Sequence, residues 1–149
     1  RNGARVLPTV LATPKPLDLV ILMLGTNDLK PAVHGHAISA KNDIKRLVSL
    51  VRHHDWALDV EGPGVLIVAP PPFCEAATPD FAAMFGRSIE ESHMLGSLYA
   101  DLADEMECGF FDASTVAKTS PLDGIHLDAA NTKAVGKALA PVVSLMLGL

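Results

Sequence analysis

The sequence predicts an α/β fold with a parallel sheet, and three observations support this prediction. Two apolar runs without polar alternation, at 19–24 and 64–69, are typical of strands buried on both faces. Stretches of helical periodicity separate these runs from each other and from a third, shorter strand. Strands that alternate with helices pair in parallel through right-handed crossovers. With 149 residues, the chain can build one real core, so we expect a single domain over 1–149.

The composition excludes several classes of protein. Hydrophobic residues make up 49% and charged residues 19%, and the mean hydropathy is +0.30, which indicates a globular chain. The net charge is −5 and no basic patch is present, so nucleic-acid binding is not expected. No apolar run reaches the ~18 residues of a membrane span. No signal peptide is visible, which favours a cytoplasmic location, although Arg1 is not an initiator methionine.

Seven elements follow from the periodicity and from the residues that end it. They are a short helix or irregular turn at 1–13, a strand at 18–24, a helix at 37–53, a strand at 64–69, a helix from 88 to about 107, a strand at 109–111 and a helix from 128 to about 147. Pro8 limits the first element, and Pro141 is expected to kink the last. Residues 55–63 form a linker. Residues 73–86 form a long irregular segment, a kind of loop that often walls a binding site.

Two of the predicted helices show one apolar face each. The first face holds Ile44, Leu47, Val48 and Val51, and the second holds Leu95, Leu98, Tyr99, Leu102 and Met106. Ser88, followed three residues later by Glu91, matches a capping box and predicts Ser88 as an N-cap. Asp128 is the expected N-cap of the last helix.

The first strand is expected to need a cover that the other predicted elements do not supply. Three strands make a thin sheet, and by this count the wholly apolar strand at 18–24 could lie at its edge. An exposed apolar edge strand invites aggregation. We therefore expect further strands, preceding Arg1, to lie beside it.

Polar residues gather where two of the predicted strands end. Gly25-Thr26-Asn27-Asp28 stops the first strand, and Asp123-Gly124-Ile125-His126 lies between the third strand and the last helix. Open α/β sheets bind ligands at this carboxyl edge. An aspartate three residues before a histidine can accept its Nδ1–H and leave Nε2 free as a base. An amide donor, a carboxylate and an imidazole are three of the parts needed for acyl transfer.

A purely structural reading of the same residues remains open. Asn27 and Asp28 are common turn formers, and Asp123 could simply cap the turn beside a surface His126. The position of both groups at one edge of the sheet favours chemistry over this alternative.

The two motifs resemble those of a known family. GTND at the end of a buried strand resembles the third sequence block of the SGNH hydrolases, also called GDSL esterases, and DGIH before a final helix resembles the fifth. The resemblance runs from about Leu17 to the C-terminus, and LDLVILMLGTNDLK, PPPF and DGIHLDAAN are most similar to the bacterial arylesterase and acyltransferase branch. It implies a three-layer α/β/α fold with a flavodoxin-like parallel sheet in the order 2-1-3-4-5. This chain would hold the C-terminal part, about three strands.

The resemblance also implies roles for individual residues. Asn27 would donate its amide to the oxyanion, His126 would be the general base and later the acid, and Asp123 would orient His126. Thr26 and Asp28 would hold the loop. Four residues match places near the acyl and alcohol pocket and are the expected substrate-binding residues: Lys30, Phe81, Phe85 and Ile125.

The nucleophile of the family is not found in this chain. The first block, Gly-Asp-Ser, carries the reactive serine, and the second carries a small residue whose backbone adds an oxyanion donor. None of the serines here follows a strand in such a context. We expect both blocks to lie upstream of Arg1, and we do not expect this chain alone to hydrolyse esters.

The predicted function is that of a serine esterase for small, including aryl, esters, or of an acyltransferase, with a small ester as partner and no cofactor. Alternatives are a carbohydrate deacetylase or a thioesterase of the same superfamily, between which residues 73–86 would decide, and a non-catalytic α/β binding or assembly module. The apolar residues at 73–85 suggest a homo-oligomer.

The histidines and cysteines outside these motifs do not predict a metal site. His34, His36, His53 and His54 have no acidic or cysteine partner at ligand spacing. Cys74 and Cys108 form no zinc signature and no disulfide framework, and they leave a single bridge between them open.

Overall fold

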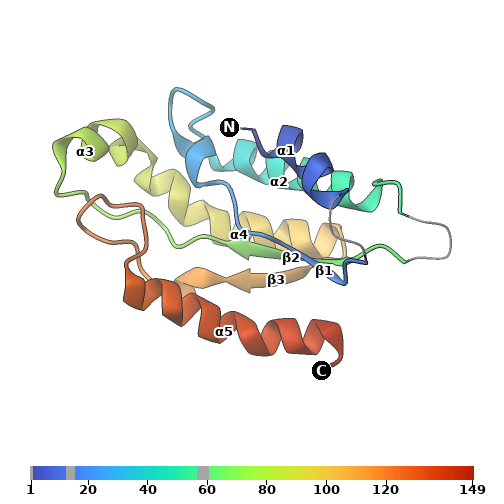
Figure 1. The fold of residues 1–149 in the computed structure, drawn as a ribbon. Helices are drawn as coiled ribbons and strands as arrows, with labels where there is room; N and C mark the ends of the chain where they lie inside the picture. The colour runs from blue at the N-terminus through green and yellow to red at the C-terminus, as the bar shows by residue number, and fades with distance from the viewer. Residues whose placement is uncertain (1, 13–15, 57–60) are drawn as a thin grey trace.

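The strands of the chain form a parallel sheet, as predicted. The computed structural model describes residues 2–12, 16–56 and 61–149 (Figure 1). Its strands pair in the order β1-β2-β3. They span Leu19–Leu22 (β1), Gly64–Ala69 (β2) and Gly109–Asp112 (β3). Part of the predicted linker, 57–60, lies outside the described residues, as do residues 1 and 13–15.

Helices cover both faces of this sheet and make three layers (Figure 1). Helices α2 and α4 pack on each other on one face, with α1 on α2, while α5 packs on the other face against β3. Their bounds are Gly3–Leu11 (α1), Ala37–Arg52 (α2), Ile89–Glu105 (α4) and Ala129–Leu147 (α5). In the described part of the chain, no helix has both the length and the apolar character that crossing a bilayer requires.

The middle strand, β2, holds the two halves of the core together. Val65 and Ile67 belong to the cluster on the side of α2 and α4, whereas Leu66 and Val68 belong to the cluster on the side of α5. This alternation follows from the period of two in a strand. Each such side chain contributes about 1.5–3 kcal/mol when fully buried. The predicted apolar stripe of α2 is confirmed, because all four of its residues are buried: Ile44, Leu47, Val48 and Val51.

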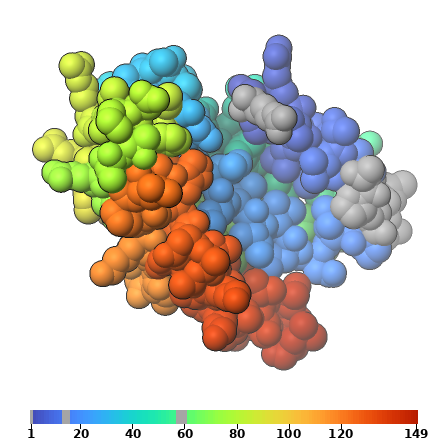
Figure 2. Space-filling view, turned by 60° about the vertical axis from the view of Figure 1, so that its left-hand side comes forward, coloured from blue at the N-terminus to red at the C-terminus, as the bar shows by residue number. Residues whose placement is uncertain are grey.

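Strand β1 lies at an edge of the described sheet, as the sequence suggested. It pairs with β2 on one side, from Leu19 opposite Gly64 to Leu22 opposite Ile67. The prediction that this strand is buried on both faces is wrong for the described chain, since Ile21 is 44% exposed. Figure 2 shows this part of the chain, in blue, open at the surface between α1 and α5.

Of the two alternatives expected for 1–13, the short helix is confirmed: α1 continues through Pro8, and its N-cap Asn2 accepts the N–H of Ala4 at 2.9 Å. The expectation for 73–86 is wrong. The segment predicted as irregular contains helix α3 (Pro79–Phe85), which begins with a proline at a position where helices tolerate one. Asp128 is confirmed as the N-cap of α5, where its side chain accepts the N–H of Asn131.

The predicted capping box of α4 is also wrong. Ser88 is the N-cap residue of α4, as predicted, but its side chain makes no cap hydrogen bond, because its hydroxyl donates instead to the carbonyl of Leu29. Glu91 accepts the N–H of Ala37 at 2.7 Å, at the start of α2. Both side chains therefore join α4 to other segments rather than closing its own first turn. Cys74 and Cys108 are free, which answers the open question of a bridge.

Candidate active site

The turn after β1 presents Asn27 at the carboxyl edge of the sheet. The 3₁₀ helix η1 (Thr26–Leu29) follows β1, and the Asp28 N–H donates to the carbonyl of Gly25 at 3.0 Å. Gly25 has a φ of 119°, in the left-handed region that glycine adopts without strain. Asn27 is exposed, and its side-chain amide makes no hydrogen bond to the described residues. This amide is therefore a donor available to a ligand.

Asp28, the next residue, helps to hold the loop that follows. Its carbonyl accepts the N–H of Gly35 at 2.9 Å. Burial raises the pKa of the Asp28 carboxyl, the nearby charge of Asp43 raises it further, and His34 lowers it. Asp43 in turn lies 3.6 Å from Nε2 of His34. These contacts place Asp28 within a local polar cluster at the base of the loop.

Asp123 holds His126 in one orientation. Its Oδ2 lies 2.8 Å from Nδ1 of the ring, and its Oδ1 accepts the backbone N–H groups of His126 and Ile125, each at 2.9 Å. These hydrogen bonds, with the two backbone donors first, lower the pKa of Asp123 from 3.8 to about 2. The carboxylate is therefore ionised at neutral pH and favours the tautomer of His126 that carries its proton on Nδ1.

The second ring nitrogen of His126 is accessible and has no protein partner. The His126 side chain is 71% exposed, and within the described residues its Nε2 makes no hydrogen bond. With Nδ1–H held by a carboxylate, Nε2 carries the lone pair and can accept a proton. Among the described residues, His126 is thus an oriented base whose Nε2 has no hydrogen bond to a hydroxyl group.

Backbone contacts fix the loop that carries Asp123 and His126. The Gly124 carbonyl accepts the N–H of Cys74 at 3.0 Å, and the Ser120 N–H donates to the carbonyl of His126 at 2.7 Å. Gly124 has a φ of 77°, and a Cβ there would lie 2.4 Å from the carbonyl oxygen of Cys74. The loop therefore needs glycine at this position to pack against the segment after β2.

Three of the expected substrate-binding residues form a row between the two loops. The Lys30 ammonium lies 5.2 Å from the centroid of the Phe85 ring. The Phe85 and Phe81 rings stack with centroids 6.3 Å apart, and the Phe81 ring meets His126 edge-on at 6.1 Å. Since Lys30 directly follows η1, this row joins the turn of Asn27 to the imidazole.

The two predicted motifs therefore lie at the same edge of the sheet. Figure 2 shows the segment before α5 (orange) beside α3 (lime), with the segment after β1 (light blue) next to them. Ile125 takes no part in the contacts of this row; like Phe85, which is 5% exposed, it is buried in the core cluster, at 8% exposure.

Two contacts that hold the turn of Asn27 have no local sequence signal. Tyr99 lies on the apolar face of α4, but its hydroxyl donates to the carbonyl of Leu24 at 3.0 Å. Ser88 has the spacing of a capping box, but its hydroxyl donates to the carbonyl of Leu29. Both contacts join segments far apart in the sequence, so no local pattern could reveal them.

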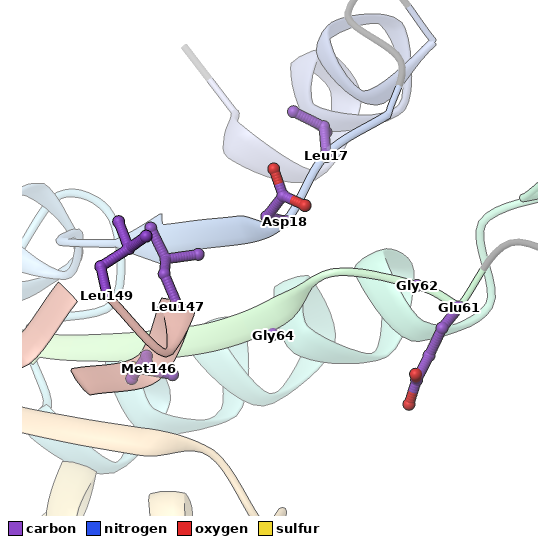
Figure 3. Close-up of a pocket in the computed structure, with 8 residues that line it drawn as sticks. All are labelled: Leu17, Asp18, Glu61, Gly62, Gly64, Met146, Leu147 and Leu149. Carbon is purple, nitrogen blue, oxygen red and sulfur yellow. The ribbon is translucent and has the colours of Figure 1, made fainter. Parts of the chain in front are cut away.

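Two cavities are lined by residues other than the candidate catalytic ones. The one drawn in Figure 3, of about 570 Å³, is lined by Leu17, Asp18 and Gly64 at the amino ends of β1 and β2, and by the end of α5. The second, of about 640 Å³, is lined by residues that follow β2 and β3 and by part of α4, and its lining includes His93 and Lys118. Neither cavity is lined by Asn27, Asp123 or His126.

The described residues offer no cluster suited to a metal ion. No group of three or more histidine, cysteine, aspartate or glutamate side chains in 2–12, 16–56 and 61–149 is arranged to hold one.

Comparison with known proteins identifies the family. No family model and no curated protein matches the chain. Among solved structures, it is similar to a carbohydrate acetylesterase family member from Sinorhizobium meliloti, at 62% identity over 100% of this chain and 70% of that chain, with a TM-score of 0.97.

Two further structures show the same likeness. A second carbohydrate acetylesterase from Sinorhizobium meliloti is 40% identical over 97% of this chain and 68% of its own, with a TM-score of 0.90. The native aryl esterase of M. smegmatis is 38% identical over 97% and 68%, with a TM-score of 0.91. On this identity and coverage, the chain belongs to the SGNH hydrolase family.

Proposed function

We propose that the full-length protein cleaves small acyl esters by a Ser-His-Asp triad, with Asn27 as a donor to the oxyanion. The coarser activity rests on the relatives: the full-length protein is a carboxylic ester hydrolase, like the acetylesterases and aryl esterases it is similar to. The observation that carries the finer proposal is the pair of oxygens of Asp123 that hold the ring and the backbone of His126.

In the proposed mechanism, Nε2 of His126 removes the proton from a serine hydroxyl as that oxygen attacks the ester carbonyl. The Asn27 amide donates to the oxyanion that develops on the carbonyl oxygen. His126 then gives its proton to the leaving alcohol, and an acyl-enzyme remains. Water, activated by the same nitrogen, releases the acid and restores the serine. An alcohol in place of water would make the reaction an acyl transfer.

The serine is proposed to come from a segment beside β1, outside this chain. The free edge of β1 can pair with one further parallel strand, and the carboxyl end of such a strand would lie next to the turn of Asn27. Ile21 and Leu24, at 44% and 47% exposure, are the apolar side chains that this segment would cover. The first similar structure has residues beyond the matched part that can form such a segment, since the match covers 70% of that chain.

The row formed by Lys30, Phe85 and Phe81 is proposed to bound the acyl or alcohol pocket. Within this row, the Phe81 ring contacts the His126 ring. An ester bound at the imidazole would therefore lie within reach of the Phe81 ring. Phe85 is 5% exposed and supports Phe81 from the core side. A small or aromatic ester suits such a surface, because a flat ring provides apolar contact without a deep pocket.

A second candidate substrate is an acetyl ester of a carbohydrate. Two of the similar structures are described as carbohydrate acetylesterases, which favours this reading of the same site. The homo-oligomer suggested by the apolar residues at 73–85 remains a prediction. Phe73 and Phe85 are buried in the core, and Met84 is an exposed large apolar residue of this segment.

The test is the hydrolysis of p-nitrophenyl acetate and of an acetylated monosaccharide by the full-length protein. His126→Ala should lower kcat for both by about 10³-fold or more. His93→Ala, which removes an exposed histidine from α4, is the matched control and should leave kcat unchanged. A His126→Ala variant with full activity on both esters would refute the proposed triad.

A further inference from the structure

One face of α4 and its entry turn holds buried hydroxyl groups that contact the loops of the carboxyl edge. Ser88, Ser92 and Tyr99 are between 0% and 2% exposed. Ser92 accepts the N–H of Phe73 at 2.9 Å, in the segment after β2. Tyr99 and Ser88 both reach the turn that carries Asn27, and they do so at its two ends.

Tyr99 holds the start of the turn. Its hydroxyl donates to the Leu24 carbonyl at 3.0 Å, and a Cβ on Gly25 would lie 2.1 Å from the same hydroxyl oxygen. Burial raises the pKa of Tyr99, and the nearby charges of Asp28 and Asp43 raise it further. The phenol therefore stays protonated, and remains a donor, throughout the neutral pH range.

Ser88 holds the end of the turn. Its hydroxyl donates to the carbonyl of Leu29, whose side chain is fully buried beneath η1. The backbone between Leu24 and Leu29 is thus anchored to α4 before and after the short stretch that includes Asn27. A carbonyl in such surroundings needs a partner, because a buried polar group without one is costly.

These hydroxyls do more than fill space. Phenylalanine would occupy nearly the volume of Tyr99, and alanine nearly that of Ser88, without placing a polar group in the core. Between the two anchored carbonyls, Asn27 has an amide that no described residue orients. The backbone of η1 sets where this side chain starts, and the two anchors hold that backbone together with the hydrogen bonds within the turn, such as that from the Asp28 N–H to the Gly25 carbonyl.

We propose that Tyr99 and Ser88 are positioning residues that aim the Asn27 amide at the oxyanion by fixing both ends of its turn. This rests on the proposed oxyanion role of Asn27. Misplacement of a catalytic group by about 1 Å can lower the rate by about 10²-fold, whereas loosening a group that binds the ground state alters KM.

The test is a double-mutant cycle on kcat with the full-length protein. Tyr99→Phe should lower kcat for p-nitrophenyl acetate by about 10- to 100-fold and leave KM unchanged. In an Asn27→Ala background, the same substitution should change kcat less than about twofold, because no amide remains to be positioned. A similar loss in both backgrounds, or no loss in either, would overturn the proposal.

Ser88→Ala repeats the test from the other end of the turn and serves if Tyr99→Phe fails to fold. Ser97→Ala is the matched control, since Ser97 lies on α4, is exposed and donates to the carbonyl of Met94. It should leave kcat unchanged. If Asn27→Ala alone retains full kcat, the oxyanion assignment fails first, and the positioning role fails with it.

Discussion

Asp123 binds His126 through both of its carboxylate oxygens, one 2.8 Å from the ring Nδ1 and the other 2.9 Å from the backbone nitrogen. The carboxylate and the imidazole are three residues apart in one loop, which contacts with the segment after β2 hold in place. This pair is the most local part of the proposed triad.

Asp123→Asn should leave the loop folded but lower kcat by about 10³- to 10⁴-fold. The asparagine amide can present an N–H to Nδ1, which would favour the tautomer with its proton on Nε2 and remove the base. The measurement is kcat for p-nitrophenyl acetate, with the melting temperature as a check of folding. Activity within threefold of the unaltered enzyme would contradict the role given to Asp123.

The stability of the protein should depend on the ionisation of Asp123 at acidic pH. The folded-state pKa of about 2 lies below the ordinary value of 3.8, so folding favours the ionised carboxylate. The stabilisation that the ionised Asp123 contributes is complete at pH values above 3.8 and is lost as the pH falls towards 2. Urea unfolding of the unaltered protein and of Asp123→Ala should differ above pH ~4 and converge below it. A difference that persists unchanged at pH ~2 would contradict this.

Gly25→Ala should destabilise the protein by about 2–4 kcal/mol and lower its activity. The substitution forces a positive φ on alanine and places its Cβ against the hydroxyl of Tyr99. Gly136→Ala is the control, because nothing lies within 4 Å of a Cβ there, and in the interior of α5 it should stabilise by about 0.5–1 kcal/mol. Chemical denaturation measures both changes; equal stabilities of the two variants would be the unexpected result.

Phe81→Ala should act on substrate binding more than on stability. Phe81 is partly exposed and meets the ring of His126, so its removal takes away an apolar wall of the site. We expect KM for aryl esters to rise by about 5- to 20-fold, from the loss of roughly 1–2 kcal/mol of contact. Met84→Ala, an exposed position on the same helix, should leave KM unchanged. Equal effects of both substitutions would remove Phe81 from the pocket.

Much of this fold could be predicted from the sequence because its signals are local. The apolar run of β2 and the stripe of α2 each specify an element and its buried face, and Asp128 marks the start of α5. The location of the candidate site could also be predicted from local signals. GTND follows a strand and DGIH precedes a helix, and parallel pairing brings the carboxyl ends of the strands to one edge of the sheet.

What could not be predicted depends on contacts between distant segments. Ser88 and Glu91 have the spacing of a capping box, but tertiary partners, Leu29 and Ala37, engage their side chains instead. Helix α3 was missed because seven residues within a proline-flanked segment give too short a pattern. Tyr99 has the same periodicity as its apolar neighbours, so its hydrogen bond to Leu24 is visible only in the folded chain.

The central claim is that His126 serves a serine nucleophile that lies outside this chain, and covalent labelling tests it most directly. The full-length protein is treated with a fluorophosphonate and the modified peptide is mapped by mass spectrometry. We predict one label per chain, on a serine outside this 149-residue sequence, and a large loss of labelling rate in His126→Ala. A label on a serine within these residues, or labelling that proceeds equally without His126, would contradict the account.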